Sequence, residues 1–176
     1  FPVSENAYDT TYDNGGNIKD DAYVTKFNND LTEMIASTYL GSGHDDFSEA
    51  VTIDSSDHIF VTGWTGSSDF PTTENAYQRE RKGWSDLFVT ALDSTGSFLN
   101  FSTFLGGSDS EEGKSLDLDA EGNILITGMT WSSDFPTSVT NKEQTSSNDP
   151  DMIIAKIGEY GQELIYSTVI GGCTGM

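Results

Sequence analysis

The 176-residue sequence predicts an all-β protein built from repeated units of four short antiparallel strands. The first observation behind this prediction is a motif that recurs every 65 residues. The second is a series of short segments, separated by turn residues, in which apolar and polar residues alternate or β-branched and aromatic residues are enriched. No segment shows the 3.6-residue apolar periodicity of a helix. The recurring motif is Thr38-Tyr39-Leu40-Gly41, Thr103-Phe104-Leu105-Gly106 and Thr168-Val169-Ile170-Gly171.

Other positions keep the same 65-residue register, so a whole unit is repeated and not only one motif. Arrays of this kind are stable because each unit buries its apolar faces against its neighbours. Equivalent apolar stretches begin at Asp21, Asp86 and Asp151, and a turn aspartate recurs as Asp54 and Asp119. A Thr-Gly pair recurs at 62–63 and 127–128, and a segment that contains Phe-Pro recurs at 67–72 and 132–137.

Within one unit the strands are expected to form two hairpins. Residues 115–119 alternate between apolar and polar, and a turn rich in Asp, Gly and Asn joins them to the apolar segment 124–128. A long connection through Phe135-Pro136 leads to the second hairpin, formed by 152–157 and 164–170. Four antiparallel strands per unit, repeated in tandem, describe the blades of a β-propeller.

Several segments resemble the SBBP repeat, a family named for seven-bladed β-propellers, and the resemblance covers essentially the whole chain. The resemblance implies a large secreted or surface protein of bacteria or archaea, in which the repeat is a structural unit without a general activity. The segments that carry it are DLFVTALD at 86–93, YSTVIGG at 166–172, DAEGNILITG at 119–128 and SDFPT at 68–72.

The hairpin around 119–123 also resembles the inner hairpin of NHL-type propellers. This second resemblance implies that residues 51–54 and 116–119 form the innermost strands of two blades. Residues 59–63 and 124–128 then form the second strands, and the two outer strands follow the Phe-Pro connection.

The blade register predicts about two and a half blades. Residues 1–41 are expected to hold a Phe-Pro loop and the outer two strands of an incomplete blade, 42–106 and 107–172 two complete blades, and 173–176 the start of the next unit. Because propellers usually close with about four to eight blades, we expect a segment of a larger propeller. Its first partners would be neighbouring blades of the same or another chain.

Composition restricts the partners and the cellular location. The chain has 8 Lys and Arg against 29 Asp and Glu, a formal net charge of −21, which argues against nucleic acid and anionic membranes as partners. Its one cysteine, Cys173, excludes an internal disulfide framework and cysteine-based metal sites. No stretch approaches the roughly 20 apolar residues that span a bilayer. An excess of Asp and Ser over Lys favours an extracellular or cell-surface protein.

Acidic residues in two connections and one turn indicate calcium as a candidate cofactor, because hard cations take carboxylate and carbonyl oxygens from such segments. The alternative is a set of solvated acidic turns. The turn candidate starts like an EF-type loop, but its twelfth position is Gly128 where a bidentate Glu is needed, so an ordinary hairpin is favoured there. The candidate ligands are Asp45, Asp46, Asp109, Glu111, Glu112, Asp117, Asp119 and Glu121.

The three tryptophans are the candidate ligand-binding residues. Trp64, Trp84 and Trp131 have no tryptophan at the equivalent repeat positions, so they do not serve the packing that all units share. Flat aromatic faces beside carboxylates suit sugar rings, through stacking and hydrogen bonds. The alternative is a half-buried aromatic residue at a strand end.

The sequence contains no constellation that indicates catalysis. The histidines His44 and His58 occur in different kinds of loop, without counterparts in the other units. We therefore expect a non-enzymatic, extracellular structural or interaction module, such as an adhesion segment that contacts glycans or surface proteins. Two alternatives stay open: a calcium-dependent carbohydrate-binding module, and a subunit of a surface filament that polymerises through sheet edges.

Overall fold

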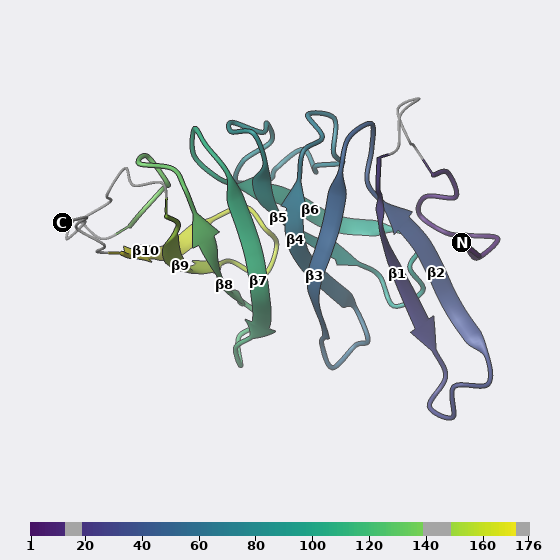
Figure 1. Ribbon diagram of the computed structural model, residues 1–176. Helices are drawn as coiled ribbons and strands as arrows, with labels where there is room; N and C mark the ends of the chain where they lie inside the picture. The colour runs from purple at the N-terminus through teal and green to yellow at the C-terminus, as the bar shows by residue number, and fades with distance from the viewer. Residues whose placement is uncertain (13–18, 139–148, 172–176) are drawn as a thin grey trace.

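The computed structural model describes residues 1–12, 19–138 and 149–171, which form ten strands in three antiparallel sheets and no helix (Figure 1). The predicted all-β fold with four-stranded propeller blades is confirmed. The described residues accordingly include no helix that is long and apolar enough to cross a membrane. The strands are β1 (Ala22–Phe27), β2 (Met34–Leu40), β3 (Asp46–Ile53), β4 (Ile59–Thr65), β5 (Asp86–Leu92), β6 (Leu99–Leu105), β7 (Glu111–Leu118), β8 (Ile124–Thr130), β9 (Asp151–Ile157) and β10 (Leu164–Ile170).

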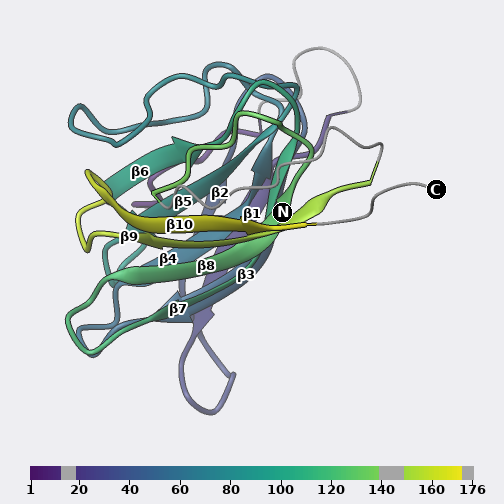
Figure 2. The same cartoon turned by 90° about the vertical axis from the view of Figure 1, so that its left-hand side faces the viewer.

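Each sheet is a meander of neighbouring strands. Strands β1 and β2 form a two-stranded sheet, the half-blade; β3-β4-β5-β6 form the first full blade and β7-β8-β9-β10 the second. Figure 2 shows the strands of the second full blade in this order. The innermost strands β3 and β7 lie side by side in the middle of the molecule (Figure 1). The three sheets therefore stack in chain order.

The inner strands are longer than expected. Strands β3 and β7 begin at Asp46 and Glu111, five residues before the predicted starts at 51 and 116. The pairing register of each strand shifts near its middle, at Glu49 and at Lys114. A bulge of this kind puts two residues opposite one, and it interrupts the alternation by which a strand is recognised in sequence.

The apolar core lies between the sheets. All seven residues of β5 are buried, because each face of the first full blade is covered by a neighbour. Leu87 and Val89 belong to the cluster shared with the second full blade, whereas Phe88 and Leu92 belong to the cluster shared with the half-blade. Phe70 and Phe135 of the Phe-Pro segments are also buried in these clusters, while Phe1 is exposed. The blades therefore stabilise one another through their faces.

The repeated Thr-Gly pair is explained by the bulges. Gly63 and Gly128 lie opposite the bulged inner strand, whose backbone approaches them closely. A Cβ atom would lie 1.8 Å from the carbonyl oxygen of Phe47 at the first position, and 2.1 Å from that of Glu112 at the second. No side chain fits at either position without moving the strand.

We expect Gly63→Ala to lower the free energy of unfolding by about 1–3 kcal/mol, because the added methyl group collides with backbone. The matched control is Gly158→Ala, whose Cβ would meet its nearest neighbour at 3.8 Å, and this variant should stay within about 0.5 kcal/mol of the parent. Urea unfolding midpoints measure both effects. Equal stability of the two variants would show that β3 does not approach Gly63 as described.

Candidate functional site

A pocket of about 230 Å³ opens between the two full blades, at the end of the sheets where the inner strands begin. We call it the tryptophan pocket, because two of the three tryptophans line it. Two predicted acidic residues line it as well, so the structure brings together residues that are distant in sequence. Its lining residues are Trp64, Ser85, Asp109, Ser110, Glu112 and Trp131.

Backbone contacts between the two full blades and within the second one hold this pocket. Ser85 and Ser110 form an isolated parallel bridge, and the N–H of Glu111 donates to the carbonyl oxygen of Ser85 at 2.9 Å. The N–H of Trp131 donates to the carbonyl oxygen of Ser110, also at 2.9 Å. These bonds place Trp131, which follows β8, beside the connection that leads into β7. The serines are not related by the repeat, and nothing in the sequence pattern singled them out.

Trp64 is held by an aromatic stack. It lies on β4 directly opposite Phe47 of β3, and the two rings stack with centroids 4.7 Å apart and planes 23° apart. Both Trp64 and Trp131 are half-buried, so part of each indole stays open to a ligand. Trp84 does not line the pocket; it lies one residue before Ser85 and is 82% exposed.

The charge of the pocket comes from two carboxylates with different neighbours. Glu112 forms an ion pair with Lys114 at 2.8 Å, and Lys114 also reaches Glu49 of the first full blade at 2.8 Å. Hydrogen bonds to Glu112 and Glu49 raise the pKa of Lys114. The exposed Asp109 is held through its backbone N–H, which donates to the hydroxyl of Ser132. Indole faces beside oxygen acceptors are therefore the chemistry that this pocket presents.

Two of the acidic residues predicted in loops are instead buried in strands. Asp46 and Glu111 are the first residues of β3 and β7, and each is almost fully inaccessible to solvent. Glu112 is likewise the second residue of β7. The prediction that these three belong to flexible connections is wrong, because the bulged strands start earlier than their alternation indicates.

The buried carboxyl groups accept hydrogen bonds from the blade junction. Oδ2 of Asp46 accepts from the N–H of Ser42 at 2.8 Å and from the hydroxyl of Ser67 at 2.9 Å. Within the described residues, Oδ1 of Asp46 has no hydrogen-bond partner. Glu111 accepts from the N–H of Gly107 at 2.8 Å and from the hydroxyl of Thr130 at 2.6 Å.

Burial changes the protonation of these groups. Desolvation raises the pKa of Asp46 to about 6, although the hydrogen bonds from Ser42 and Ser67 oppose the change. Desolvation likewise raises the pKa of Glu111 to about 7, and the nearby Asp86 adds to the effect. The pKa of Asp86 itself is raised by burial. These carboxyl groups are buried within the junction between sheets, where their hydrogen bonds are made with the protein itself.

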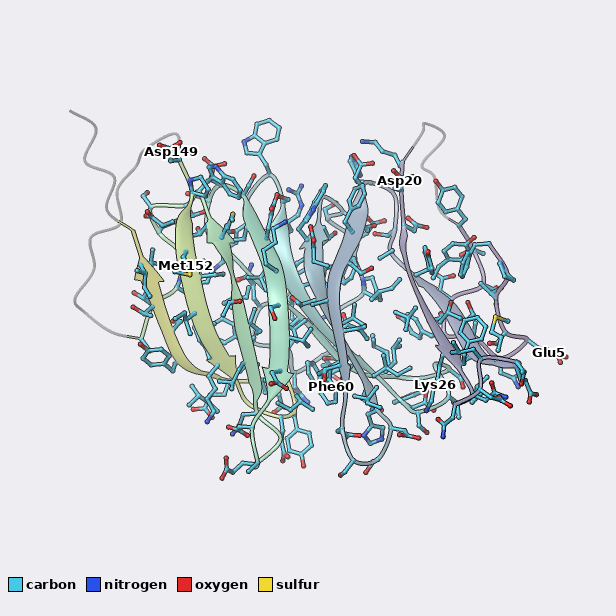
Figure 3. The ribbon with its side chains drawn as sticks, turned by 60° about the horizontal axis from the view of Figure 1, so that its bottom comes forward. Glu5, Asp20, Lys26, Phe60, Asp149 and Met152 are labelled. Atoms are coloured by element: carbon cyan, nitrogen blue, oxygen red, sulfur yellow. The ribbon has the colours of Figure 1, made fainter. Side chains whose placement is uncertain are left out.

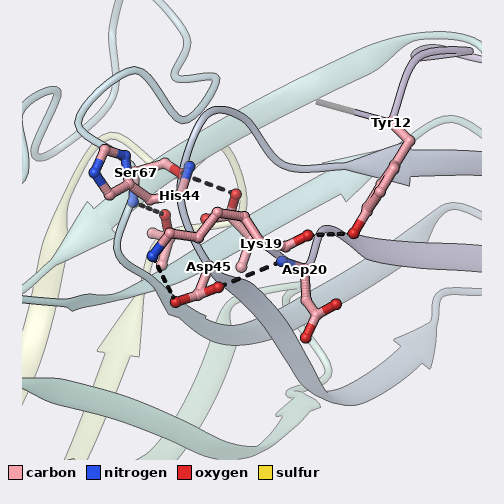
Figure 4. A network of polar contacts seen from close by, with 8 residues as sticks. Tyr12, Lys19, Asp20, His44, Asp45 and Ser67 are labelled. Carbon is pink, nitrogen blue, oxygen red and sulfur yellow. Dashed lines mark hydrogen bonds and ion pairs between the residues drawn. The ribbon is translucent and has the colours of Figure 1, made fainter. Parts of the chain in front are cut away.

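The remaining candidate ligands are engaged elsewhere. Asp45 forms an ion pair with Lys19 at 3.1 Å and accepts a hydrogen bond from the N–H of Asp20, as Figure 4 shows. Its neighbour His44 donates its backbone N–H to Ser67 in the same view (Figure 4).

Asp117, Asp119 and Glu121 lie at the opposite end of the sheet, in or beside the β7–β8 turn. The carboxylate of Asp119 accepts the N–H groups of Glu121 and Asn123 at 2.9 Å each, and it pairs with Lys156 at 2.6 Å. That ion pair holds the pKa of Asp119 far below its usual range. Asp117 is exposed on the strand, so the segment forms a hairpin turn.

The eight candidate metal ligands are therefore spread over several places. Among the residues that the structure describes, no three His, Cys, Asp or Glu side chains are arranged to hold a metal ion. Calcium binding has no ligand set in this part of the chain and stays a prediction.

The geometry agrees with what comparison with known proteins finds. A family model described as the SBBP β-propeller repeat matches residues 37–71 and residues 100–136. Each matched segment starts in the last strand of one sheet, crosses the junction and the inner hairpin of the next, and ends at the proline of the Phe-Pro segment. No curated protein matches the chain.

We expect the melting temperature to rise by several degrees when the pH is lowered from about 8 to about 5. In this range folded Glu111 and Asp46, with pKa values of about 7 and about 6, bind protons that the unfolded chain has released, since its carboxyl pKa values lie near 4. This stabilisation is complete below the unfolded values and is lost as the pH rises through the folded ones. Scanning calorimetry across this range measures it.

The high net charge also favours folding at lower pH, so a control is needed. Glu111→Gln should flatten the dependence, whereas Glu74→Gln, which removes an exposed carboxylate, should leave most of it. A Glu111→Gln profile that parallels the parent would contradict the buried-carboxyl explanation.

Proposed function

We propose that this chain, which carries SBBP β-propeller repeats, is a non-enzymatic structural and interaction module of an extracellular or cell-surface protein. The repeat supports a role in presenting and packing surfaces, since each blade is completed by contacts with its neighbours. The excess of Asp and Ser over Lys supports an extracellular location. His58 bonds to the turn residue Asp54 through Nδ1 at 2.8 Å, which fits a structural role for this histidine.

The observation that carries the proposal is the exposure of apolar residues on the outer face of the second full blade. Met152 and Ile170 are 48% and 49% exposed. Their repeat counterparts in the first full blade, Leu87 and Leu105, are both fully buried against the second full blade. The same positions are thus apolar in both blades, and the difference in burial comes from whether a further sheet covers them.

The apolar outer face of the second full blade fits another blade as its partner. Leu87 and Leu105 pack on a neighbouring blade, so we propose that Met152 and Ile170 pack on another blade of the same kind, from the same or another chain. The half-blade shows the same contrast, because Tyr23 is exposed where its counterpart Phe88 is buried. Apolar faces of this kind mark interaction surfaces.

Thiol labelling of the intact protein tests both the packing and the location. In a Cys173→Ser background, a membrane-impermeant maleimide added to cells and culture medium should modify the Trp84→Cys variant rapidly, because this position is 82% exposed. The Met152→Cys variant should react at least about tenfold more slowly, because a neighbouring blade covers it.

Two results would count against this proposal. Equal labelling rates would show that no blade covers the face of β9, and modification of the Trp84→Cys variant only after cell lysis would exclude an extracellular location. Electron microscopy of the purified protein then distinguishes a closed propeller from a filament in which the covering blade belongs to another copy.

The tryptophan pocket favours a second candidate function, the binding of carbohydrate. Two partly open indoles lie beside the oxygen acceptors of Asp109 and Glu112. Sugar rings stack on indole faces while their hydroxyl groups donate to carboxylates. The serine hydroxyls of Ser85 and Ser110 add polar groups to the same wall.

Glycan-array binding tests this second candidate. We expect Trp131→Ala to weaken binding of a recognised glycan at least about tenfold, the loss of roughly one stacking contact. Trp84→Ala is the matched control and should bind like the parent, because Trp84 lies outside the pocket. Repeating the assay with a chelator tests calcium dependence separately. No recognised glycan, or equal loss in both variants, would rule out this pocket as a sugar site.

A further inference from the structure

A second and larger cavity, of about 480 Å³, lies between the same two blades at the opposite end of the sheets. Its floor is apolar and includes Phe60 and Phe101, which are buried. Figure 3 shows Phe60 at the turn end of the blades, the end at which Lys26 of the half-blade also lies. Phe98 and Tyr160 at the cavity are 65% and 67% exposed, so it opens to solvent between aromatic rings.

The repeat shows what is missing from this cavity. Ala91 lines it, and the residues 65 positions before and after it are Lys26 and Lys156. Two of the three sheets therefore carry a lysine at this repeat position, on β1 and on β9, whereas the first full blade carries an alanine on β5. The cavity lies where a lysine side chain at 91 would extend.

Lys26 shows which groups surround such an ammonium across a blade interface. Its Nζ atom lies 3.3 Å from Oδ2 of Asp57 and donates to the carbonyl oxygen of Ser94 at 3.2 Å, both in the neighbouring blade. The counterparts of these two residues at the next interface are Gly122 and Glu159, and both line the cavity. The carboxylate of Glu159 lies 3.3 Å from where a Cβ of Gly122 would be. Glu159 thus places a negative charge beside Gly122, as Asp57 does at the interface between the half-blade and the first full blade.

Lys156 shows the contact that the same position makes within its own blade. Its ammonium pairs with Asp119 at 2.6 Å, and the counterpart of Asp119 is Asp54, which lines the cavity. Burial raises the pKa of Asp54, but hydrogen bonds from the backbone and ring of His58 outweigh this, so its pKa lies below the ordinary value. Asp54 is thus ionised at neutral pH. Nδ1 of His58 lies 2.8 Å from Oδ2 of Asp54 and forms a hydrogen bond with it.

We propose that this cavity binds a small primary alkylammonium ion in the position of the missing lysine side chain. The ammonium group lies near the carboxylates of Asp54 and Glu159, and the alkyl stem lies on the rings of Phe60 and Phe101. Exposed aromatic faces at the opening add cation–π attraction, and the net charge of −21 concentrates cations around the protein. This site is separate from the tryptophan pocket and does not depend on the functions proposed above.

Titration of the intact protein with n-butylammonium, followed by protein-observed NMR, tests the proposal. This ion has the four carbons and the ammonium of a lysine side chain, and 1-butanol is its neutral counterpart. We expect shifts at the cavity residues with n-butylammonium and at least about tenfold weaker binding of 1-butanol, since a contact between an ammonium and a carboxylate is stronger than one that a neutral hydroxyl makes.

Variants of the chain make the test specific. Ala91→Lys should abolish binding by filling the cavity with the side chain that the ligand imitates, and Asp54→Asn should weaken it about tenfold. Asp117→Asn removes an exposed carboxylate outside the cavity and should bind like the parent. If Ala91→Lys does not fold, Ala91→Met fills the same space without a charge. Absence of binding, equal binding of 1-butanol, or unchanged binding in the filled variant would each overturn the proposal.

Discussion

The buried carboxyl group at the first position of each inner strand is the interaction on which the blade arrangement depends. Asp46 and Glu111 accept the N–H groups of Ser42 and Gly107, so each holds the chain as it passes from the last strand of one sheet to the first strand of the next. The backbone and the carboxyl groups approach each other closely at this junction. A Cβ on Gly106 would lie 2.5 Å from both the Glu111 carboxylate and Asp86. Both full blades are entered through such a junction, so the stacking of the sheets in chain order rests on it.

Both candidate binding sites lie at the interface between the two full blades, and both arise where one blade departs from the repeat. At the junction end, Trp64 and Trp131 have no tryptophan at their repeat-equivalent positions, and they line one pocket from the two blades. At the turn end, Ala91 replaces a lysine and leaves a cavity. Positions that the blades share pack the core or hold the junction, whereas positions that differ leave space for ligands. In a repeat protein, function is therefore expected where the units are not identical.

Much of this could be predicted from residue pattern alone, and the errors have identifiable causes. The alternation does not indicate the early start of β3 and β7, because bulges at Glu49 and Lys114 interrupt it. For the same reason the alternation does not indicate that Asp46 and Glu111 are buried, since an acidic residue before a recognisable strand is typical of a loop. The cavity beside Ala91 does have a signal in the sequence, namely an alanine at the repeat position that is lysine at Lys26 and Lys156. Its meaning depends on partners in another blade, so the pattern by itself did not reveal it.

Local alternation, turn residues and a countable repeat are enough to predict which segments contain strands, how the strands group into blades and the order of the units. The tertiary structure alone decided which carboxyl groups are buried, which tryptophans share a pocket and where a cavity lies. These properties depend on contacts between blades, in which residues distant in the chain approach within a few ångströms. Solvation and charge are set by those contacts, and residue type does not encode them.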